Sequence, residues 1–169
     1  MAFNNLILDA SAFYSGVLFQ SGSKCYTTYE ILEEIKHIHR HFSLITMAIQ
    51  SGNLVIHEPS REIKKKVMHM AKKTGDYSRL STADISILTL ALELNFPLVT
   101  NDYAVQNVGK LLEISIKSAG IAGISNIRKW ITVCKTCRKN YGSQIKICDI
   151  CGNKLTRMHI SLKIKKDSG

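Results

Sequence analysis

Four of the five cysteines fall in one short window, and their spacing limits what this part of the chain can fold into. They form two Cys-x-x-Cys pairs, Cys134 with Cys137 and Cys148 with Cys151, separated by ten residues. Tetrahedral zinc takes four thiolates, and each Cys-x-x-Cys turn supplies two of them. Iron in the same four-sulfur cage is the competing interpretation. Because the window has few apolar residues, metal ligation has to supply much of its folding free energy. We therefore predict a small four-cysteine zinc ribbon.

The chain shows no apolar segment long enough to cross a membrane, since its most apolar stretch, 85–99, is interrupted by Glu93 and Pro97. The apolar run Leu6-Ile7-Leu8 is followed at once by Asp9, so no signal peptide is expected. We expect a cytoplasmic location without a membrane partner, where thiols stay reduced and bind metal instead of forming disulfides. The fifth cysteine, Cys25, has no motif around it and is expected to be a small, partly buried residue.

The formal net charge of +10 is distributed unevenly along the chain. Residues 1–120 hold 12 Lys/Arg and 11 Asp/Glu, whereas residues 121–169 hold 11 Lys/Arg and only 2 Asp/Glu. A basic block of this kind typically neutralises phosphates by releasing condensed counterions, which favours a nucleic-acid partner. A solvated tail that keeps the protein soluble is the alternative interpretation.

A stretch of small residues, 118–126, suits a linker between two structural units. We predict a first domain over 1–121, a linker over 122–129, the ribbon over 130–156 and a basic tail over 157–169. Within the tail, 158–165 alternates apolar and polar residues as a strand does.

The first domain alternates short apolar strands with helical patterns, which is typical of a parallel α/β sheet flanked by helices. Strands are predicted at 6–8, 54–56, 97–100 and 114–116, and the segment from Gly22 to Thr27 is interpreted as a loop. Helices are predicted over 12–19, from a capping box at Thr27 and Glu30, over 42–49 and 61–73, from a capping box at Ser81 and Asp84, and over 103–111.

Acidic residues stand where predicted strands and helices meet. Asp9 directly follows the strand 6–8, and Asp102 follows the strand 97–100. Ligands collect at the carboxyl edge of open α/β sheets, and clustered carboxylates are what hard Mg²⁺ or Mn²⁺ ions require. Each acid also has a simpler interpretation: Asp102 and Asp84 as helix caps, and Glu34 as an ordinary boundary residue. For Asp9 neither a cap nor a solvated face gives a good explanation.

Four acidic segments, in this order along the chain, resemble the acidic motifs of PIN-domain nucleases: Asp9-Ala10-Ser11-Ala12-Phe13, Glu34 at the end of 27–35, Leu80-Ser81-Thr82-Ala83-Asp84 and Val99-Thr100-Asn101-Asp102. The segment Thr74-Gly75-Asp76-Tyr77-Ser78, together with the ribbon, is similar to the Nob family, endoribonucleases that mature the 3′ end of small-subunit ribosomal RNA. The resemblance covers about residues 5–152, and the compact form looks archaeal.

The resemblance implies a PIN-like sheet and a metal-dependent endoribonuclease. Asp9, Glu34, Asp84 and Asp102 would hold one or two Mg²⁺ or Mn²⁺ ions, which activate water and leave a 3′-hydroxyl and a 5′-phosphate. Glu34 is selected over Glu30 and Glu33 because the family's acid precedes the second apolar residue of its helix. The partner implied is the precursor small ribosomal subunit, with assembly factors as further partners. A non-catalytic RNA-binding assembly factor that works through its ribbon is the alternative, and a toxin-like PIN ribonuclease ranks below both.

Other residues have two interpretations each. Ser11 and Thr100 can support the carboxylates or bond to the local backbone, and Asp76 can support the site or form a turn. The lysines 64–66 and 72–73 are a solvated helix face or an RNA contact. Trp130 and Tyr141 can stack on bases, although packing over the ribbon is the preferred use for Trp130. A metal site at His37, His39 and His41 is disfavoured because no acidic motif matches it.

Overall fold

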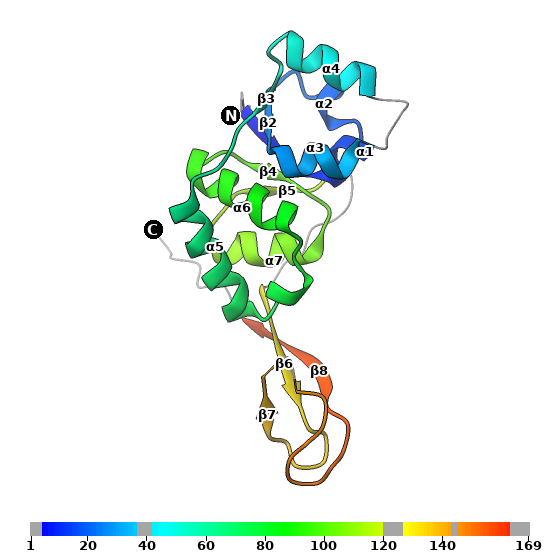
Figure 1. Cartoon of the computed structure of the whole chain (residues 1–169), viewed down its shortest axis with the longest axis vertical. Helices are drawn as coiled ribbons and strands as arrows, with labels where there is room; N and C mark the ends of the chain where they lie inside the picture. Colours follow the sequence, from blue (N-terminus) through cyan, green and yellow to red (C-terminus); the bar gives the residue numbers. More distant parts are fainter. Residues whose placement is uncertain (1–4, 37–41, 120–126, 143–144, 163–169) are drawn as a thin grey trace.

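A five-stranded parallel sheet forms the first structural unit (Figure 1). The computed structural model describes residues 5–36, 42–119, 127–142 and 145–162. The strands are β1 (Asn5–Leu8), β2 (Lys24–Thr27), β3 (Leu54–Ile56), β4 (Leu98–Val99) and β5 (Ile116–Lys117), arranged in the order β3-β2-β1-β4-β5. The predicted parallel α/β sheet is therefore confirmed.

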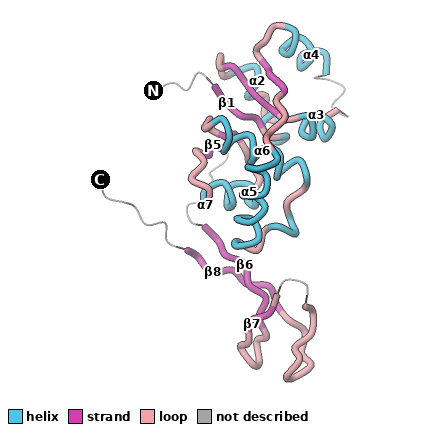
Figure 2. Tube along the Cα trace, turned by 60° about the vertical axis from the view of Figure 1, so that its left-hand side comes forward, coloured by secondary structure: helices cyan, strands magenta, loops and turns pink. Residues whose placement is uncertain are grey.

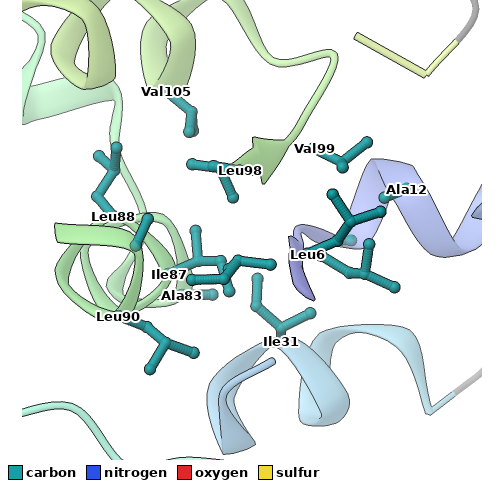
Figure 3. Close-up of a cluster of buried hydrophobic side chains, with 14 of the residues drawn as sticks. Leu6, Ala12, Ile31, Ala83, Ile87, Leu88, Leu90, Leu98, Val99 and Val105 are labelled. Atoms are coloured by element: carbon teal, nitrogen blue, oxygen red, sulfur yellow. The ribbon is translucent and has the colours of Figure 1, made fainter. Parts of the chain in front are cut away.

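The neighbouring strands β1 and β4, in the interior of the sheet, carry much of its core. Ile7, Leu8 and Leu98 are completely or almost completely buried, as expected for parallel strands that are covered on both faces. Ile31 and Ile87, from two different helices, pack into the same cluster (Figure 3). This apolar packing fixes the position and direction of β1 and β4, and acidic residues follow the carboxyl ends of both strands.

Seven α-helices and one 3₁₀ turn connect the strands within the described residues. They are α1 (Ala10–Tyr14), α2 (Val17–Gln20), α3 (Tyr29–Ile35), α4 (Phe42–Gln50), α5 (Arg61–Thr74), η1 (Tyr77–Arg79), α6 (Thr82–Leu94) and α7 (Tyr103–Leu111). Helix α6 packs against α3, α5 and β1, so it lies at the centre of the helical contacts. No helix in the described part of the chain is long and apolar enough to span a bilayer.

Three local predictions were wrong. The segment from Gly22 to Thr27 contains strand β2, whose pairing with β1 and β3 is decided by partners far away in the sequence. The helix predicted over 12–19 is split into α1 and α2 at Gly16, which has a φ of 72°. Thr27 does not cap α3: its hydroxyl donates to the Leu8 carbonyl, and Thr28 occupies the cap position without a side-chain bond.

The three histidines 37, 39 and 41 lie outside the described residues.

A second, three-stranded antiparallel sheet follows, with strand order β7-β6-β8 (Figure 2). Its strands are β6 (Ile127–Val133), β7 (Asn140–Tyr141) and β8 (Thr156–Leu162). The long ladder runs from Ile127 paired with Leu162 to Val133 paired with Thr156. Strand pairing thus reaches beyond 130–156, into segments that the sequence suggested as linker and tail.

The stem of this hairpin packs on the first unit at the end of α5. Gly75 has a φ of 73°, and a Cβ placed on it would lie 2.7 Å from the Trp130 carbonyl oxygen. One guanidinium nitrogen of Arg157 donates to the Gly75 carbonyl at 2.9 Å, and the guanidinium lies 4.6 Å from the centre of the Trp130 ring. Only glycine permits this backbone conformation together with such a close approach.

We expect Gly75→Ala to lower the free energy of unfolding more than Gly52→Ala does. Gly52 has a φ of 75°, but a Cβ added there would meet no atom within 4 Å, so its substitution adds only left-handed backbone strain, about 1–2 kcal/mol. At Gly75 the contact with Trp130 adds about 1–3 kcal/mol of overpacking. Urea unfolding of both variants measures the difference, and equal losses would contradict the close packing of the stem.

Candidate active site

The pairing of β1 with β4 places two of the predicted acids at one edge of the sheet. Ile7 pairs with Leu98 and Leu8 with Val99, so Asp9 follows β1 at the same level at which Thr100 follows β4. The chain passes from β1 to β2 on one side and reaches β4 on the other, which makes this edge a topological switch point. Ligand sites of open α/β sheets lie at such points.

Asp9 is buried, with 4% of its surface exposed, and it is held by three hydrogen bonds. Oδ1 accepts from the backbone of Ala10 at 2.8 Å, and Oδ2 accepts from Thr100 Oγ1 at 2.6 Å and from Ser11 Oγ at 3.1 Å. Asp9 is thus the N-cap of α1, a role that the sequence did not suggest. A carboxylate in a fixed orientation at a buried strand end is suited to binding a cation.

Ser11 and Thr100 support the acid and the backbone at the same time. The Ser11 hydroxyl accepts from the Asn101 backbone at 2.9 Å, and the Thr100 hydroxyl accepts from the Asp102 backbone at 3.1 Å. Both interpretations made from the sequence therefore hold. The two hydroxyls tie the loop after β4 to Asp9.

Asp102 and Asp84 both cap helices, as the simpler interpretation predicted. Asp102 Oδ1 accepts from the backbones of Ala104 and Val105 at the start of α7, so Oδ2 is not used for capping. Asp84 and Ser81 form a complete capping box at the start of α6. A capping role does not remove an acid from the site, because each carboxylate has a second oxygen and a fixed orientation.

The three aspartates influence one another electrostatically, and the Thr100 hydroxyl contacts both Asp9 and the backbone of Asp102. Burial raises the pKa of Asp9, and the neighbouring Asp102 charge raises it further against the hydrogen bonds from Thr100, Ala10 and Ser11. Burial also raises the pKa of Asp84 to about 6, and the charges of Asp9 and Asp102 add to this shift. The structure therefore brings Asp9, Asp84 and Asp102 into one negatively charged region.

The structure does not link Glu34 to this region in the same way. Glu34 is exposed on α3, and its side chain makes no hydrogen bond or ion pair with a described residue. Glu30, one helical turn earlier on the same side of α3, accepts from Ser86 Oγ of α6 at 2.8 Å and is half-buried. The sequence assigned Glu30 to a cap, and that assignment was wrong. Glu33 is exposed and pairs with Lys36 at 2.5 Å, as its solvent-facing position predicted.

The aspartates offer the oxygen ligands that hard cations prefer, but they do not form a closed cage. In the described part of the chain, no three carboxylates have their oxygens within 4.8 Å of one another. Mg²⁺ usually keeps several waters and takes one or two carboxylates from a protein, which fits a spread set of acids. Repulsion between the like charges also favours this spread.

The four ribbon cysteines do form a closed set. Their sulfur atoms all lie within 4.8 Å of one another, with 3.5 Å between Cys134 and Cys151 and 3.9 Å between Cys137 and Cys148. Tetrahedral zinc with bonds of about 2.3 Å requires sulfur atoms about 3.8 Å apart. The cluster can therefore hold zinc, and the fit extends to iron bound by four thiolates.

Comparison with known proteins assigns the family. A family model described as the PIN domain of ribonuclease matches residues 6–94, more than half of the chain. Endoribonuclease Nob1 of Methanocaldococcus jannaschii is 40% identical over 166 residues, covering 95% of this chain and 80% of that protein. Endoribonuclease Nob1 of Methanothermobacter thermautotrophicus is 34% identical over 163 residues, covering 93% of this chain and 94% of that protein. The chain belongs to the Nob family of PIN-domain endoribonucleases.

A more distant member of the Nob family is the 20S-pre-rRNA D-site endonuclease nob1 of Schizosaccharomyces pombe. It is 35% identical over 92 residues, which is 53% of this chain and 23% of that protein. The predicted PIN-like fold and the endoribonuclease class are thus confirmed, as is the resemblance to the Nob family stated from the motifs.

The Nob-like segment Thr74–Ser78 contacts the second sheet through Gly75 and Asp76. Asp76 is completely buried, its Oδ2 accepts from Asn107 of α7 at 2.6 Å, and its Oδ1 lies 3.8 Å from Arg157 of β8. It is more than a turn residue, and its contacts join the two units. Trp130 packs at the same junction, with Arg157 above its ring and His159 at its edge.

The remaining candidates have local partners. Tyr141 bonds to Asp149 and lies 2.9 Å from the Cys148 sulfur, within the ribbon. Cys25 of β2 is completely buried, which is more than the partial burial expected, and burial raises its pKa. Lys72 lies over the Tyr77 ring at 5.1 Å, while Lys65 and Lys66 are exposed on α5.

We expect Asp84→Asn to raise the melting temperature of the metal-free protein at pH 7.5 but not at pH 4. The folded-state pKa of about 6 lies above the ordinary value of 3.8, so the folded protein binds more protons than the unfolded chain between these values. Stability therefore falls as the pH rises through this window, and asparagine avoids that loss. A gain of a few degrees is expected, since about 1 kcal/mol corresponds to about 2–4 °C at this size.

Calorimetry at both pH values with a chelator present measures this effect. Added Mg²⁺ should narrow the gap at pH 7.5, because it binds and stabilises the wild type more than the variant. An equal gain at both pH values would show that Asp84 is not destabilised by its charge.

We expect about one zinc per chain by metal analysis, and we expect Cys148→Ser to unfold residues 130–155 while the parallel sheet stays folded. We expect the loops of this segment to depend on the cysteine cluster, because their apolar residues Ile145, Ile147 and Ile150 are exposed. Limited proteolysis and zinc analysis of both proteins test this. A ribbon that stays protected in the variant would contradict a structural metal site.

Proposed function

We propose that this chain is a metal-dependent endoribonuclease that cleaves precursor small-subunit ribosomal RNA near its mature 3′ end. The observation that carries the proposal is the gathering of Asp9, Asp84 and Asp102 at the switch point of the sheet, in a member of the Nob family. A pre-rRNA endonuclease among the relatives supports the substrate class.

The proposed ligand set for Mg²⁺ or Mn²⁺ is Asp9, Glu34, Asp84 and Asp102. A divalent cation bound there would supply positive charge against the scissile phosphate and make the attacking water more acidic. Asp9 is the fixed member of the set, because Thr100 and Ser11 hold its orientation. Asp102 is equally restrained by its capping bonds at the start of α7.

Asp84 connects cation binding to pH. With a pKa of about 6 it is partly protonated just below neutral pH, and a bound cation would favour its charged form. Cation affinity should therefore rise as the pH rises through this value. In this proposal hydrolysis leaves a 3′-hydroxyl and a 5′-phosphate.

The basic C-terminal segment is the proposed RNA grip. Eleven Lys/Arg against two Asp/Glu in residues 121–169 provide the charge, and zinc bound by Cys134, Cys137, Cys148 and Cys151 would keep the segment folded. Recognition of RNA often uses shape and backbone contacts, which suits this segment. A cytoplasmic site of action, with assembly factors as additional partners, completes the proposal.

We expect Asp9→Asn to abolish Mn²⁺-dependent cleavage of a precursor RNA that spans the mature 3′ end, with a loss of at least about a hundredfold. RNA affinity should change little, because the basic segment is intact. Cleavage is followed by mapping of the new terminus, and affinity by fluorescence anisotropy. If the wild-type protein never cuts this RNA with Mn²⁺ or Mg²⁺, the alternative of a non-catalytic assembly factor is supported.

The glutamate of the site is tested by a matched pair of variants, Glu34→Gln and Glu30→Gln. If Glu34 joins the aspartates when a cation binds, Glu34→Gln should lower cleavage at least about tenfold while the melting temperature stays the same. Glu30→Gln should keep most activity but lose stability, because it weakens the bond from Ser86 that links α3 to α6. The reverse result would assign the catalytic role to Glu30.

A further inference from the structure

A groove lies at the junction between the ribbon and the nuclease unit, and none of the three clustered aspartates lines it. It has a volume of about 500 Å³, within the range of small-ligand sites. Ser78 of η1 lines it from the nuclease unit, and Thr132 of β6 and Arg157 of β8 line it from the second sheet. The five remaining lining residues come from the loops of the ribbon. Figure 1 shows β6 and β8 leaving the nuclease unit below α5 and α7.

The lining residues from the ribbon loops alternate apolar and cationic side chains. Ile147 and Lys154 form a bridge pair, and the Leu155 backbone donates to the Lys146 carbonyl at 3.0 Å. These two neighbouring pairs each combine one lysine with one aliphatic residue, and all four residues line the groove. Ile147 exposes 59% of its surface and Ile145, which also lines the groove, exposes 48%. Such exposure of isoleucine in a small module points to a surface that is covered by a ligand.

The charged residues that line the groove are all cationic, and no aspartate or glutamate is among the described residues that line it. Two acids lie nearby in the sequence. Asp149 is paired with Lys139 at 2.9 Å, and the buried Asp76 lies beside Arg157. Lys146 and Lys154 are exposed and form no ion pair with a described residue. The groove therefore favours a ligand that combines a flat apolar group with negative charge.

The side chain of Arg157, which lines the groove, is held in place by its contacts. This side chain lies between Trp130 and the buried Asp76, and it donates to the Gly75 carbonyl. Because its charge is partly offset by Asp76, Arg157 serves mainly to shape the groove. The two lysines remain as the charges available to a ligand.

We infer that this junction groove binds one unpaired nucleotide of the RNA substrate. The base lies against Ile145, Ile147 and Leu155, and the flanking phosphates contact Lys146 and Lys154. Bases that are unpaired can be splayed into such a site, whereas a duplex presents only its backbone. This inference rests on the proposed function for the identity of the ligand as RNA. It adds a binding site outside the cleavage site.

The test uses the full-length, zinc-loaded chain carrying Asp9→Asn, without Mg²⁺ or Mn²⁺, so that binding is measured apart from cleavage. The probe is a fluorescent uridine dodecamer, followed by anisotropy between 50 and 300 mM salt. Lys146→Gln with Lys154→Gln is compared with Lys65→Gln with Lys66→Gln, two exposed lysines on α5. Both double variants remove the same charge, so the comparison separates contact from net charge.

Loss of two phosphate contacts should reduce the salt slope by about 1.4 and weaken binding about 20-fold at 0.1 M salt. The α5 control should stay within about twofold of the parent. Equal losses in both double variants, or no loss in either, would overturn the inference.

The base contact has its own readout. Ile147→Ser should weaken binding of the uridine dodecamer but leave binding of inorganic polyphosphate unchanged, since polyphosphate has no base. A dodecamer with one 4-thiouridine should crosslink to groove residues on irradiation. Uridine monophosphate should compete poorly, whereas strong competition would identify a free nucleotide as the ligand instead of RNA. Crosslinks confined to α5 or to the aspartate edge would contradict the site.

These results are independent of the nuclease test. If the chain binds the dodecamer through the groove but never cuts precursor RNA, the groove site is supported and the proposed nuclease activity is contradicted. If the chain cuts precursor RNA but binds the dodecamer equally well after Lys146→Gln with Lys154→Gln, the activity is supported and the groove site is contradicted.

Discussion

Pairing of β1 with β4 is the interaction on which the candidate active site depends, because it joins two segments that are far apart in the chain. Asp9 and Thr100 are separated by 91 positions, yet the register of Leu8 with Val99 places them within hydrogen-bond distance. The buried side chains of both strands hold this register through apolar packing. A shift of one residue would turn these side chains to the opposite face and would separate the acids.

The aspartates combine structural and functional roles. Asp9, Asp84 and Asp102 each cap a helix, so their carboxylates are oriented before any ligand is bound. Burial raises the pKa of Asp9 and Asp84, and the charges of the neighbouring aspartates add to both shifts, so the ionised site destabilises the folded protein near neutral pH. Buried carboxylates with raised pKa values are typical of functional sites, where their negative charge is available to a cation.

The junction between the units gives a physical meaning to the segment Thr74–Ser78. Gly75 permits the close approach of the Trp130 backbone, and Asp76 lies between Asn107 of α7 and Arg157 of β8. A buried carboxylate is costly unless hydrogen bonds and a cation compensate its charge. Asn107 and Arg157 offset this cost only in part, because Asp76 Oδ1 accepts no hydrogen bond from a described residue and burial still raises the pKa of Asp76. Asp102 is the N-cap of α7, the helix that carries Asn107, so the junction and the acidic edge share one element.

Features set by local spacing could be predicted from the sequence, and features set by distant partners could not. Short-range geometry predicted the two Cys-x-x-Cys pairs, the capping box of Ser81 with Asp84 and helix Tyr103–Leu111. The structure contains all three features. The order of the acidic motifs also indicated a PIN-domain nuclease, and the segment Thr74–Ser78 together with the ribbon indicated the Nob family. Strand β2, the bond of Glu30 to Ser86 and the burial of Asp76 depend on partners across the fold. Tertiary packing decided these, because a strand or a buried charge is stabilised by neighbours that its own segment does not contain.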